Sequence, residues 1–300
     1  MTRSYATPLA FKAALEARLR ERAAGQGRSL NRVRQLLVME RFLARVFPAI
    51  GSAVLKGGLV MELRLDRARA TKDVDLRVSV RADELLDRLQ AAGRLDLGDF
   101  MAFEVRADPS HPTIEADGLR YDGQRFRVEG RLAGRTYGSA FGVDIAVGEP
   151  LVGTPQDLDG SDTLAFVGLS PPRFHVYPVE THIAEKLHAY TLPRPRPNSR
   201  VKDLPDIALL AEAGALDASN LARAIRETFA HRATHPVPPR LAAPPEAWAP
   251  VYARMAEEDD LPWSDLASLG AAVRAFLDPA LAGVGGLWDP TAWRWGGAEP

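Results

Sequence analysis

The stretch Val54-Leu55-Lys56-Gly57-Gly58, followed by Thr71-Lys72-Asp73-Val74-Asp75-Leu76, decides the fold of this chain. The first part is a short apolar run that ends in a glycine pair, and the apolar residues after the glycines recur at helical spacing. In the second part polar and apolar residues alternate, which is the period of a half-buried strand. The sequence therefore predicts a strand, a glycine turn, a helix and a second strand that carries two aspartates.

Three aspartates are candidates for a metal site. Asp73 and Asp75 are two apart in the second strand, so their side chains leave the same face with Cα atoms about 6.6 Å apart. Asp144 lies in another expected strand, Phe141 to Val147, where an unpaired carboxylate among apolar residues would be costly. Converging carboxylates repel one another unless a cation intervenes, and oxygen ligands of this kind suit Mg²⁺ or Mn²⁺. We therefore expect metal-dependent phosphoryl or nucleotidyl transfer at Asp73, Asp75 and Asp144.

The glycine pair adds a phosphate-binding element. Because glycine has no Cβ, the backbone N–H groups of Gly57 and Gly58 can approach phosphate oxygens, and the following helix directs its N-terminal dipole at them. Lys56 is placed to fix this loop or a phosphate. Either motif alone is common elsewhere, since a D-x-D pair often lies on a solvated strand and a double glycine is usually a turn. Their order along the chain is what favours a functional site.

Composition limits the chemistry. The chain has 300 residues, of which 46% are hydrophobic, enough to bury a large core. It contains no cysteine, so any metal must bind carboxylates or histidines. Its net charge of -1 means that a polyanion would need a local basic patch. The sequence has no apolar stretch long enough to cross a membrane and begins without a signal peptide, so we expect a cytoplasmic protein with no membrane contact.

The hydrophobic pattern predicts an α+β first half and a helical second half. Two helices are expected between Pro8 and Phe47 and another from about Ala82 to Ala92, with β-like runs at Met101–Val105, Leu119–Tyr121, Arg125–Glu129 and Phe141–Val147 completing a mixed sheet. Five amphipathic helices are expected after Pro150, at 180–190, 203–213, 221–230, 248–257 and 264–276. A tail with Trp288, Trp293 and Trp295 is expected to pack back onto them. The boundary falls near residues 160 to 175.

Two further motifs extend the pattern downstream. They are Glu185-Lys186-Leu187-His188-Ala189 and Arg200-Val201-Lys202-Asp203-Leu204-Pro205-Asp206. Together with the glycine pair and the D-x-D strand, they resemble the AbiEii/AbiGii toxin family of the DNA polymerase β-like nucleotidyltransferases, a family that includes the MenT toxins. The resemblance spans roughly residues 50 to 210.

The resemblance implies a role for each motif. Asp73 and Asp75 would bind metal, Asp144 would complete the triad, Lys186 would meet the nucleotide triphosphate, and Asp203 or Asp206 would support catalysis. The residues expected to contact the nucleotide are Lys56, Gly57, Gly58, Thr71, Lys186, Arg200, Lys202 and Asp206. The implied fold is a nucleotidyltransferase-type mixed-sheet domain with flanking helices over residues 1–165, followed by a helical domain over residues 166–300 that contributes Lys186 and Asp203 or Asp206 to the cleft.

The resemblance also implies substrates and partners. Family members act as toxins beside a cognate antitoxin, and the MenT group adds pyrimidine nucleotides to the 3′ end of tRNA. We therefore expect transfer of a nucleoside monophosphate from an NTP to an acceptor hydroxyl, with tRNA as the acceptor. Two alternatives stay open: a protein side chain as the acceptor, and a catalytically silent module that binds nucleotide or RNA.

Two groups of basic residues are candidates for gripping a triphosphate or an RNA acceptor end. The first comprises Arg194, Arg196, Arg200 and Lys202, close to the downstream motifs. The second comprises Arg64, Arg67 and Arg69, between the glycine pair and the D-x-D strand. Taken alone, either group is also typical of a solvated surface.

Overall fold

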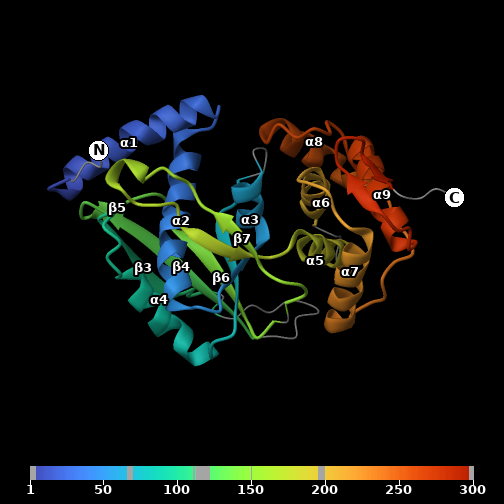
Figure 1. Ribbon diagram of the computed structural model, residues 1–300, viewed down its shortest axis with the longest axis horizontal. Helices are drawn as coiled ribbons and strands as arrows, with labels where there is room; N and C mark the ends of the chain where they lie inside the picture. Colours follow the sequence, from blue (N-terminus) through green and yellow to red (C-terminus); the bar gives the residue numbers. More distant parts are fainter. Residues whose placement is uncertain are drawn as a thin grey trace.

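A mixed sheet of eight strands organises the first half of the chain (Figure 1). The structure is a computed structural model that describes residues 5–65, 70–110, 112, 122–149, 151–194 and 200–296. The strands are β1 (Val54–Lys56), β2 (Asp73–Val78), β3 (Met101–Ala107), β4 (Asp122–Leu132), β5 (Arg135–Thr136), β6 (Phe141–Val147), β7 (Gln156–Asp159) and β8 (Arg173–Val176). They lie in the order β3-β4-β6-β2-β1-β8-β7, and β5 pairs with β4. The pairs β2–β6 and β1–β8 are parallel, and the other pairs are antiparallel.

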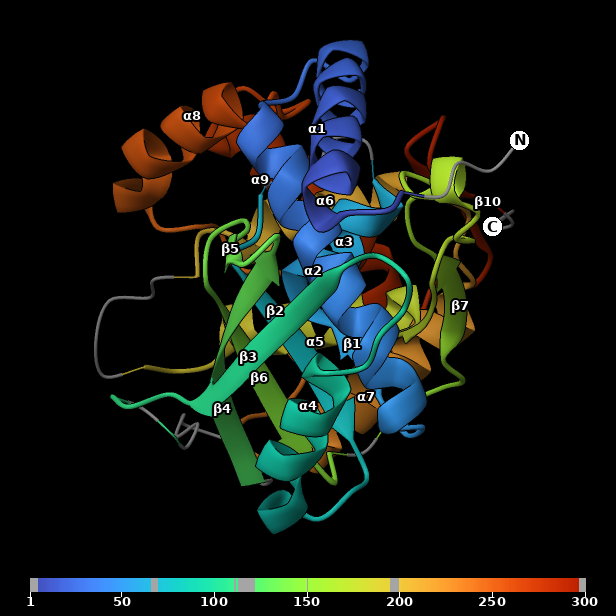
Figure 2. The same cartoon turned by 90° about the vertical axis from the view of Figure 1, so that its left-hand side faces the viewer.

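Helices cover one face of this sheet (Figures 1 and 2). They are α1 (Pro8–Gly25), α2 (Leu30–Ala49) and α4 (Leu85–Gly93), the last preceded by a 3₁₀ turn at Ala82–Glu84. The hydroxyls of Thr7 and Ser29 cap the first two helices by accepting the N–H groups of Ala10 and Arg32. The apolar residues of β2 face these helices, so its polar residues face the opposite side.

The helical second half lies beside the sheet, next to α3 (Gly57–Arg64) (Figure 1). It contains α5 (Val179–Thr191), α6 (Asp203–Glu212), α7 (Ala218–Arg232), α8 (Ala249–Glu258) and α9 (Leu266–Leu281), with a 3₁₀ turn at Glu246–Trp248. Another 3₁₀ turn, Ala165–Val167, packs on the first half of the chain. A final hairpin of β9 (Leu287–Asp289) and β10 (Arg294–Gly296) follows. Trp288 is buried against Phe276, with ring centroids 4.8 Å apart, so the tryptophan tail packs back as expected.

Two hydrophobic cores correspond to the two halves. One contains the sheet residues and the helices on its covered face, and it runs from Phe11 to Val176. The other contains the apolar residues of the C-terminal helices, from Ile183 to Trp288, together with Met61 of α3 (Gly57–Arg64). Helix α3 therefore contributes to both cores.

The predicted fold class, a mixed sheet with flanking helices followed by helices, is confirmed. Strands β7 and β8 were not expected, and β8 adds to the sheet beside β1 although it lies after residue 165. Both are short, and β7 is almost entirely exposed, so neither has the apolar run by which strands are found in a sequence. The expected strand Leu119–Tyr121 lies outside the described residues. No helix in the described ranges is long and apolar enough to cross a bilayer.

Candidate active site

A row of four charged residues crosses the face of the sheet opposite α2 and α4. Strand register pairs Lys56 with Asp75, Asp75 with Asp144, and Asp144 with Arg125. Paired residues on neighbouring strands lie about 5 Å apart with their side chains on the same face. Two carboxylates from separate strands therefore stand side by side, with a cation at each end of the row.

Asp73 joins this row on the same face, one pleat away from Asp75. Its partner in the register is Gly142 of β6, where a methyl group would lie only 2.6 Å from the Asp73 Oδ1 atom. Gly57 makes the corresponding space for Asp75, because a methyl group there would overlap the Asp75 Oδ2 atom. Gly57 also has a φ of +72°, which favours glycine. Both carboxylates are thus fitted closely against glycine backbone.

The position of Asp75 changes its acidity. Burial raises the pKa of its carboxyl to about 6, the positive charge of Lys56 opposes this rise, and the negative charges of Asp144 and Asp73 add to it. The charge of Lys186 also lowers the pKa of Asp75, so this lysine of α5 lies within electrostatic range of the row. A carboxylate under this repulsion is stabilised by a nearby cation.

Asp144 is held by Arg125, whose role the sequence did not suggest. Its two carboxylate oxygens accept hydrogen bonds from Arg125 Nε at 2.6 Å and Nη2 at 2.7 Å. This bidentate pair raises the pKa of the guanidinium, through the hydrogen bond first and then the charge of Asp144. Arg125 lies in a strand of alternating polar and apolar residues, where a polar residue on the face opposite the core gives no local sign of function.

The three aspartates provide the donor type that Mg²⁺ or Mn²⁺ takes. Their carboxylate oxygens lie on one face of two adjacent parallel strands, and the negative charges of Asp144 and Asp73 raise the pKa of Asp75. Within the ranges that the structure describes, no three acidic or histidine side chains already form a closed metal-binding set. The carboxylate of Asp144 is paired with the guanidinium of Arg125, which is consistent with the absence of such a set among the described residues.

Lys186 belongs to a buried ion-pair group at the start of α6. Its Nζ lies 2.5 Å from Asp206 Oδ2 and 3.7 Å from Asp203 Oδ1, and its side chain is 9% exposed. Both aspartates lie in the first turn of α6, which favours negative charge. Arg200 Nε lies 4.0 Å from Asp203, whereas Lys202 is exposed. The two downstream motifs are therefore brought together by direct contacts.

A second group of charged residues, centred on Glu149, binds the ammonium of Lys56. The Glu149 carboxylate is buried and receives Lys56 Nζ, Arg232 Nη2 at 2.6 Å and the Tyr177 hydroxyl at 3.1 Å. Glu185 lies 4.0 Å from Lys56 and 3.4 Å from Arg232. The sequence pattern alone predicts no role for Glu149, Glu185 or Arg232. Only Glu185 lies in one of the motifs, directly before Lys186.

Three other residues that the sequence predicts to contact the nucleotide or its phosphates are Thr71, Gly58 and Arg64. Thr71 donates its N–H to Glu62 Oε2 at 3.0 Å and its hydroxyl to the Asp73 carbonyl at 3.2 Å, so it shapes the entry into β2. Gly58 lies in the first turn of α3. Arg64 donates to Gln156 at 2.5 Å and to the Tyr177 carbonyl at 3.0 Å.

The structure describes only some of the arginines and lysines in the two basic groups that the sequence predicts. Arg194 is partly buried, and its Nη2 lies 3.4 Å from the Ala189 carbonyl oxygen. Arg67, Arg69 and Arg196 lie outside the described residues.

Comparison with known proteins gives one family. The family model described as "Nucleotidyl transferase AbiEii toxin, Type IV TA system" matches residues 41–278. No curated protein is significantly similar to the chain in sequence.

Among solved structures, MenT4, a nucleotidyltransferase toxin from Mycobacterium tuberculosis, is similar with a TM-score of 0.59 and 17% identity over 93% of this chain and 92% of that chain. Two Helicobacter pylori proteins follow. One is JHP933, with a TM-score of 0.48 and 13% identity over 84% of this chain and 94% of that chain. The other is a putative nucleotidyltransferase, with a TM-score of 0.46 and 14% identity over 83% and 97%. At this level of identity, the likeness to MenT4 shows the fold alone.

Proposed function

This chain belongs to the AbiEii family of nucleotidyl transferase toxins from type IV toxin-antitoxin systems, and from that premise we propose that it transfers a nucleoside monophosphate from an NTP to the 3′ end of tRNA with the help of Mg²⁺ or Mn²⁺. The observation that carries the proposal is the register of β2 and β6, which sets Asp75 beside Asp144 with Asp73 on the same face. We expect the reaction in the cytoplasm, where NTPs and tRNA occur, under the control of a cognate antitoxin protein.

Asp73, Asp75 and Asp144 are the proposed metal ligands. A bound Mg²⁺ or Mn²⁺ supplies activation of the acceptor hydroxyl and neutralises charge on the triphosphate. Before metal binds, the carboxyl of Asp75 has a pKa of about 6 and is therefore mostly ionised at pH 7, which is the form that binds a cation. It or Asp144 takes the proton of the acceptor hydroxyl.

The proposed triphosphate site lies around the glycine turn and α5. The N–H groups of Gly57 and Gly58 open helix α3, and they face the phosphates in this proposal. Lys186 supplies the positive charge, and Asp203 and Asp206 hold its ammonium in place. The hydroxyl of Thr71 donates to the Asp73 carbonyl, and we propose that this hydrogen bond fixes the start of β2 beside the triphosphate site.

Further nucleotide contacts are proposed for Lys56, Arg200 and Lys202. Lys56 also acts on Asp75, because its charge lowers the pKa of that carboxyl. Its ammonium is shared with Glu149, so we expect it to order the site more than to bind phosphate by itself.

The test is transfer of label from each of the four NTPs to total tRNA or to protein extract, in Mg²⁺. We expect label on tRNA, and Asp73→Ala or Lys186→Ala lowers the rate at least about 100-fold, since removal of a metal ligand or a phosphate contact removes several kcal/mol of transition-state stabilisation. Asp157→Ala removes an exposed carboxylate of β7 in the same sheet and is the matched control.

Other outcomes separate the alternatives. Label on protein instead of RNA identifies a protein-modifying enzyme, and no label on either identifies a silent binding module. Full transfer activity in the Asp73→Ala or Lys186→Ala variant contradicts the assignment of the site.

A further inference from the structure

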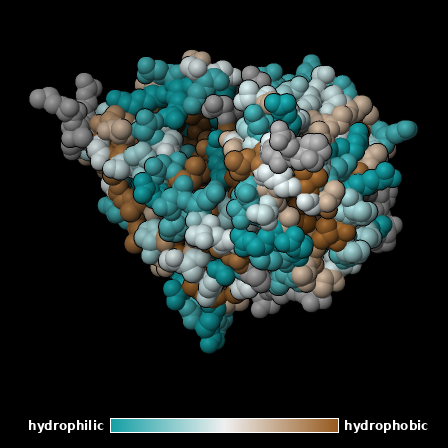
Figure 3. Space-filling view, turned by 45° about the vertical axis from the view of Figure 1, so that its right-hand side comes forward, coloured by the Kyte–Doolittle hydropathy of each residue, from teal (hydrophilic) through white to brown (hydrophobic). Residues whose placement is uncertain are grey.

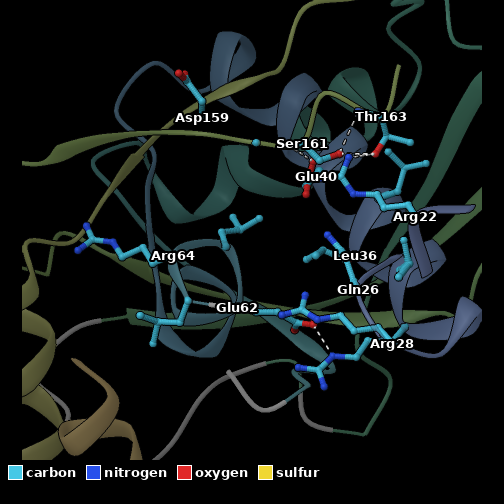
Figure 4. A pocket seen from close by; sticks show the side chains of 16 residues that line it. Arg22, Gln26, Arg28, Leu36, Glu40, Glu62, Arg64, Asp159, Ser161 and Thr163 are labelled. Atoms are coloured by element: carbon cyan, nitrogen blue, oxygen red, sulfur yellow. Dashed lines mark hydrogen bonds and ion pairs between the residues drawn. The ribbon is translucent and has the colours of Figure 1, made fainter. Parts of the chain in front are cut away.

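A polar cavity lies apart from the row of aspartates proposed to bind metal. Its volume is about 190 Å³, and it is enclosed by the end of α1, the first half of α2, the end of α3 and the loop after β7 (Figure 4). This is smaller than the roughly 300–1,000 Å³ of sites for drug-sized ligands, so it suits a single small unit. A hollow of the molecular surface is visible in the space-filling view (Figure 3).

Arginines from three segments line this cavity. Arg22 comes from α1, Arg28 from the turn between α1 and α2, and Arg32 from the first turn of α2. Arg22 donates to Asp162 at 2.7 Å and to the Thr163 hydroxyl at 3.3 Å, and Arg32 donates through Nε to Glu62 at 2.9 Å. The guanidinium groups of Arg22 and Arg32 are thus held in place, and the fork of donors on a guanidinium is suited to phosphate oxygens.

Two buried carboxyl groups also line the cavity, and one of them, Glu62, is the ion-pair partner of Arg32. Glu40, from the middle of α2, is 1% exposed, and its Oε2 accepts the Ser161 N–H at 2.8 Å. Glu62 is 6% exposed and lies on the α3 side (Figure 4). The side chains of Leu36, Leu63 and Leu65 provide an apolar wall between the polar groups. Phosphate donors, an apolar wall and buried carboxyl groups together suit the phosphate and the base of a nucleotide, because carboxyl groups accept hydrogen bonds from amino groups of bases, and bases pack on flat or apolar side chains.

The cavity is linked to the aspartates through α3 and Glu62. Helix α3 begins at Gly57, against Asp75, and its last turn lines the cavity, so the two sites are separated by its length of about 12 Å. Glu62 also accepts the N–H of Thr71, two residues before Asp73. At about 3.4 Å per stacked nucleotide, 12 Å corresponds to three or four residues of a single strand.

We propose that this cavity is an acceptor-strand site, which holds one nucleotide of the RNA three or four residues before its reacting 3′ end. The arginines contact the phosphate, and the leucine wall and the carboxyl groups of Glu40 and Glu62 contact the base. This inference rests on one part of the proposed function, namely that the acceptor of the nucleotide is RNA.

Two variants test it by different means. Arg28→Glu reverses a charge at the cavity, and Leu36→Trp fills its volume. Arg20→Glu makes the same charge change on an arginine of α1 that is 64% exposed and does not line the cavity, and it is the matched control. For each protein the measurements are the Kd for a fluorescent 12-nucleotide RNA, the KM for tRNA, the KM for the NTP, and the turnover of a dinucleotide acceptor that is too short to reach the cavity.

We expect both cavity variants to raise the Kd for RNA and the KM for tRNA about tenfold or more, while the KM for the NTP and turnover of the dinucleotide stay within twofold of the wild type. Unchanged RNA affinity in both variants overturns the proposal. A free nucleoside monophosphate that binds the cavity while RNA affinity is unaffected by the variants also overturns it, because the site then serves free nucleotides.

The RNA titration separates this inference from the proposed function. If the wild type binds RNA but transfers nothing to it, the proposed reaction fails, and weaker RNA binding by the two variants still supports the cavity as an RNA site. If the wild type binds no RNA, both fail.

Discussion

Glu40 is a single carboxyl group whose environment makes folding depend on pH. Burial raises its pKa to about 7, while the hydrogen bond from Ser161 and the charges of Arg22 and Arg41 oppose the rise. In the unfolded chain its pKa is near the ordinary value of about 4.3. Between these two values the folded protein keeps the proton and the unfolded chain loses it, so the free energy of unfolding falls as pH rises from about 4.5 to 7 and then levels off.

Replacing Glu40 by glutamine removes this dependence. At about 1.4 kcal/mol per pH unit, we expect the free energy of unfolding of Glu40→Gln relative to the wild type to increase by up to about 3 kcal/mol between pH 4.5 and 7. Urea denaturation at several pH values measures it. Glu104→Gln, which removes an exposed carboxylate on β3, is the control for loss of a charge. A difference between Glu40→Gln and wild type that does not change with pH would show that Glu40 is already ionised in the folded protein.

Single residues of the candidate site differ in how far the sequence could predict them. Asp73 and Asp75 share a face because side chains in any strand alternate, which is a local rule. The position of Asp75 beside Asp144 depends on the register of two strands whose residues are about 70 apart in the sequence. No local rule predicts this register. It was expected only because an aspartate among apolar residues needs a partner or a metal ion. Arg125, Glu149 and Arg232 are ordinary charged residues in sequence, and their contacts arise only from tertiary packing.

At the scale of elements, the glycine turn between β1 and α3 gives a sharp prediction. In Gly57→Ala the new methyl group overlaps Asp75 Oδ2, and the backbone must keep a φ of +72°. We expect the aspartate to move, transfer activity to fall at least about 100-fold, and the free energy of unfolding to fall by about 1 kcal/mol or more.

Gly134→Ala is the matched control for that change. Gly134 lies in the turn between β4 and β5 with a φ of +73°, but nothing lies within 4 Å of the position of its added methyl group. It should lose a similar amount of stability and keep its activity. Equal activity in the two variants would show that Asp75 does not need its present position.

Elements with a strong apolar period were predicted well, and short polar ones were not. The expected strand Phe141–Val147 coincides with β6, because most of its residues are buried. Strand β8 reads Arg-Phe-His-Val and has only two buried residues, so a four-residue window does not separate it from a loop. Its place beside β1 is a parallel pairing across more than 100 residues, which no local pattern encodes.

At the scale of the whole molecule, the two hydrophobic cores are joined by charged groups around the candidate site. Lys186 of the helical half lies near Asp75 of the sheet, and Arg232 at the end of α7 reaches Glu149, which follows β6. We therefore expect the orientation of the helical half relative to Asp73, Asp75 and Asp144 to depend on these contacts as well as on α3, which is shared by both cores.

Arg232→Met tests this connection between the two halves. The side chain of Arg232 is 11% exposed and that of Glu149 is 2% exposed, so the variant leaves a buried carboxylate with one cation fewer, and loss of one partner of a buried pair typically costs about 3–5 kcal/mol of stability. We expect a lower melting temperature and, well below it, a reduced kcat, because Glu149 then draws Lys56 away from Asp75. Arg232→Lys, which keeps the charge, should recover part of both, and Arg226→Met, at an exposed position on the same helix, should change neither. If Arg232→Met keeps the wild-type kcat while folded, the helical half is positioned by α3 and apolar packing alone.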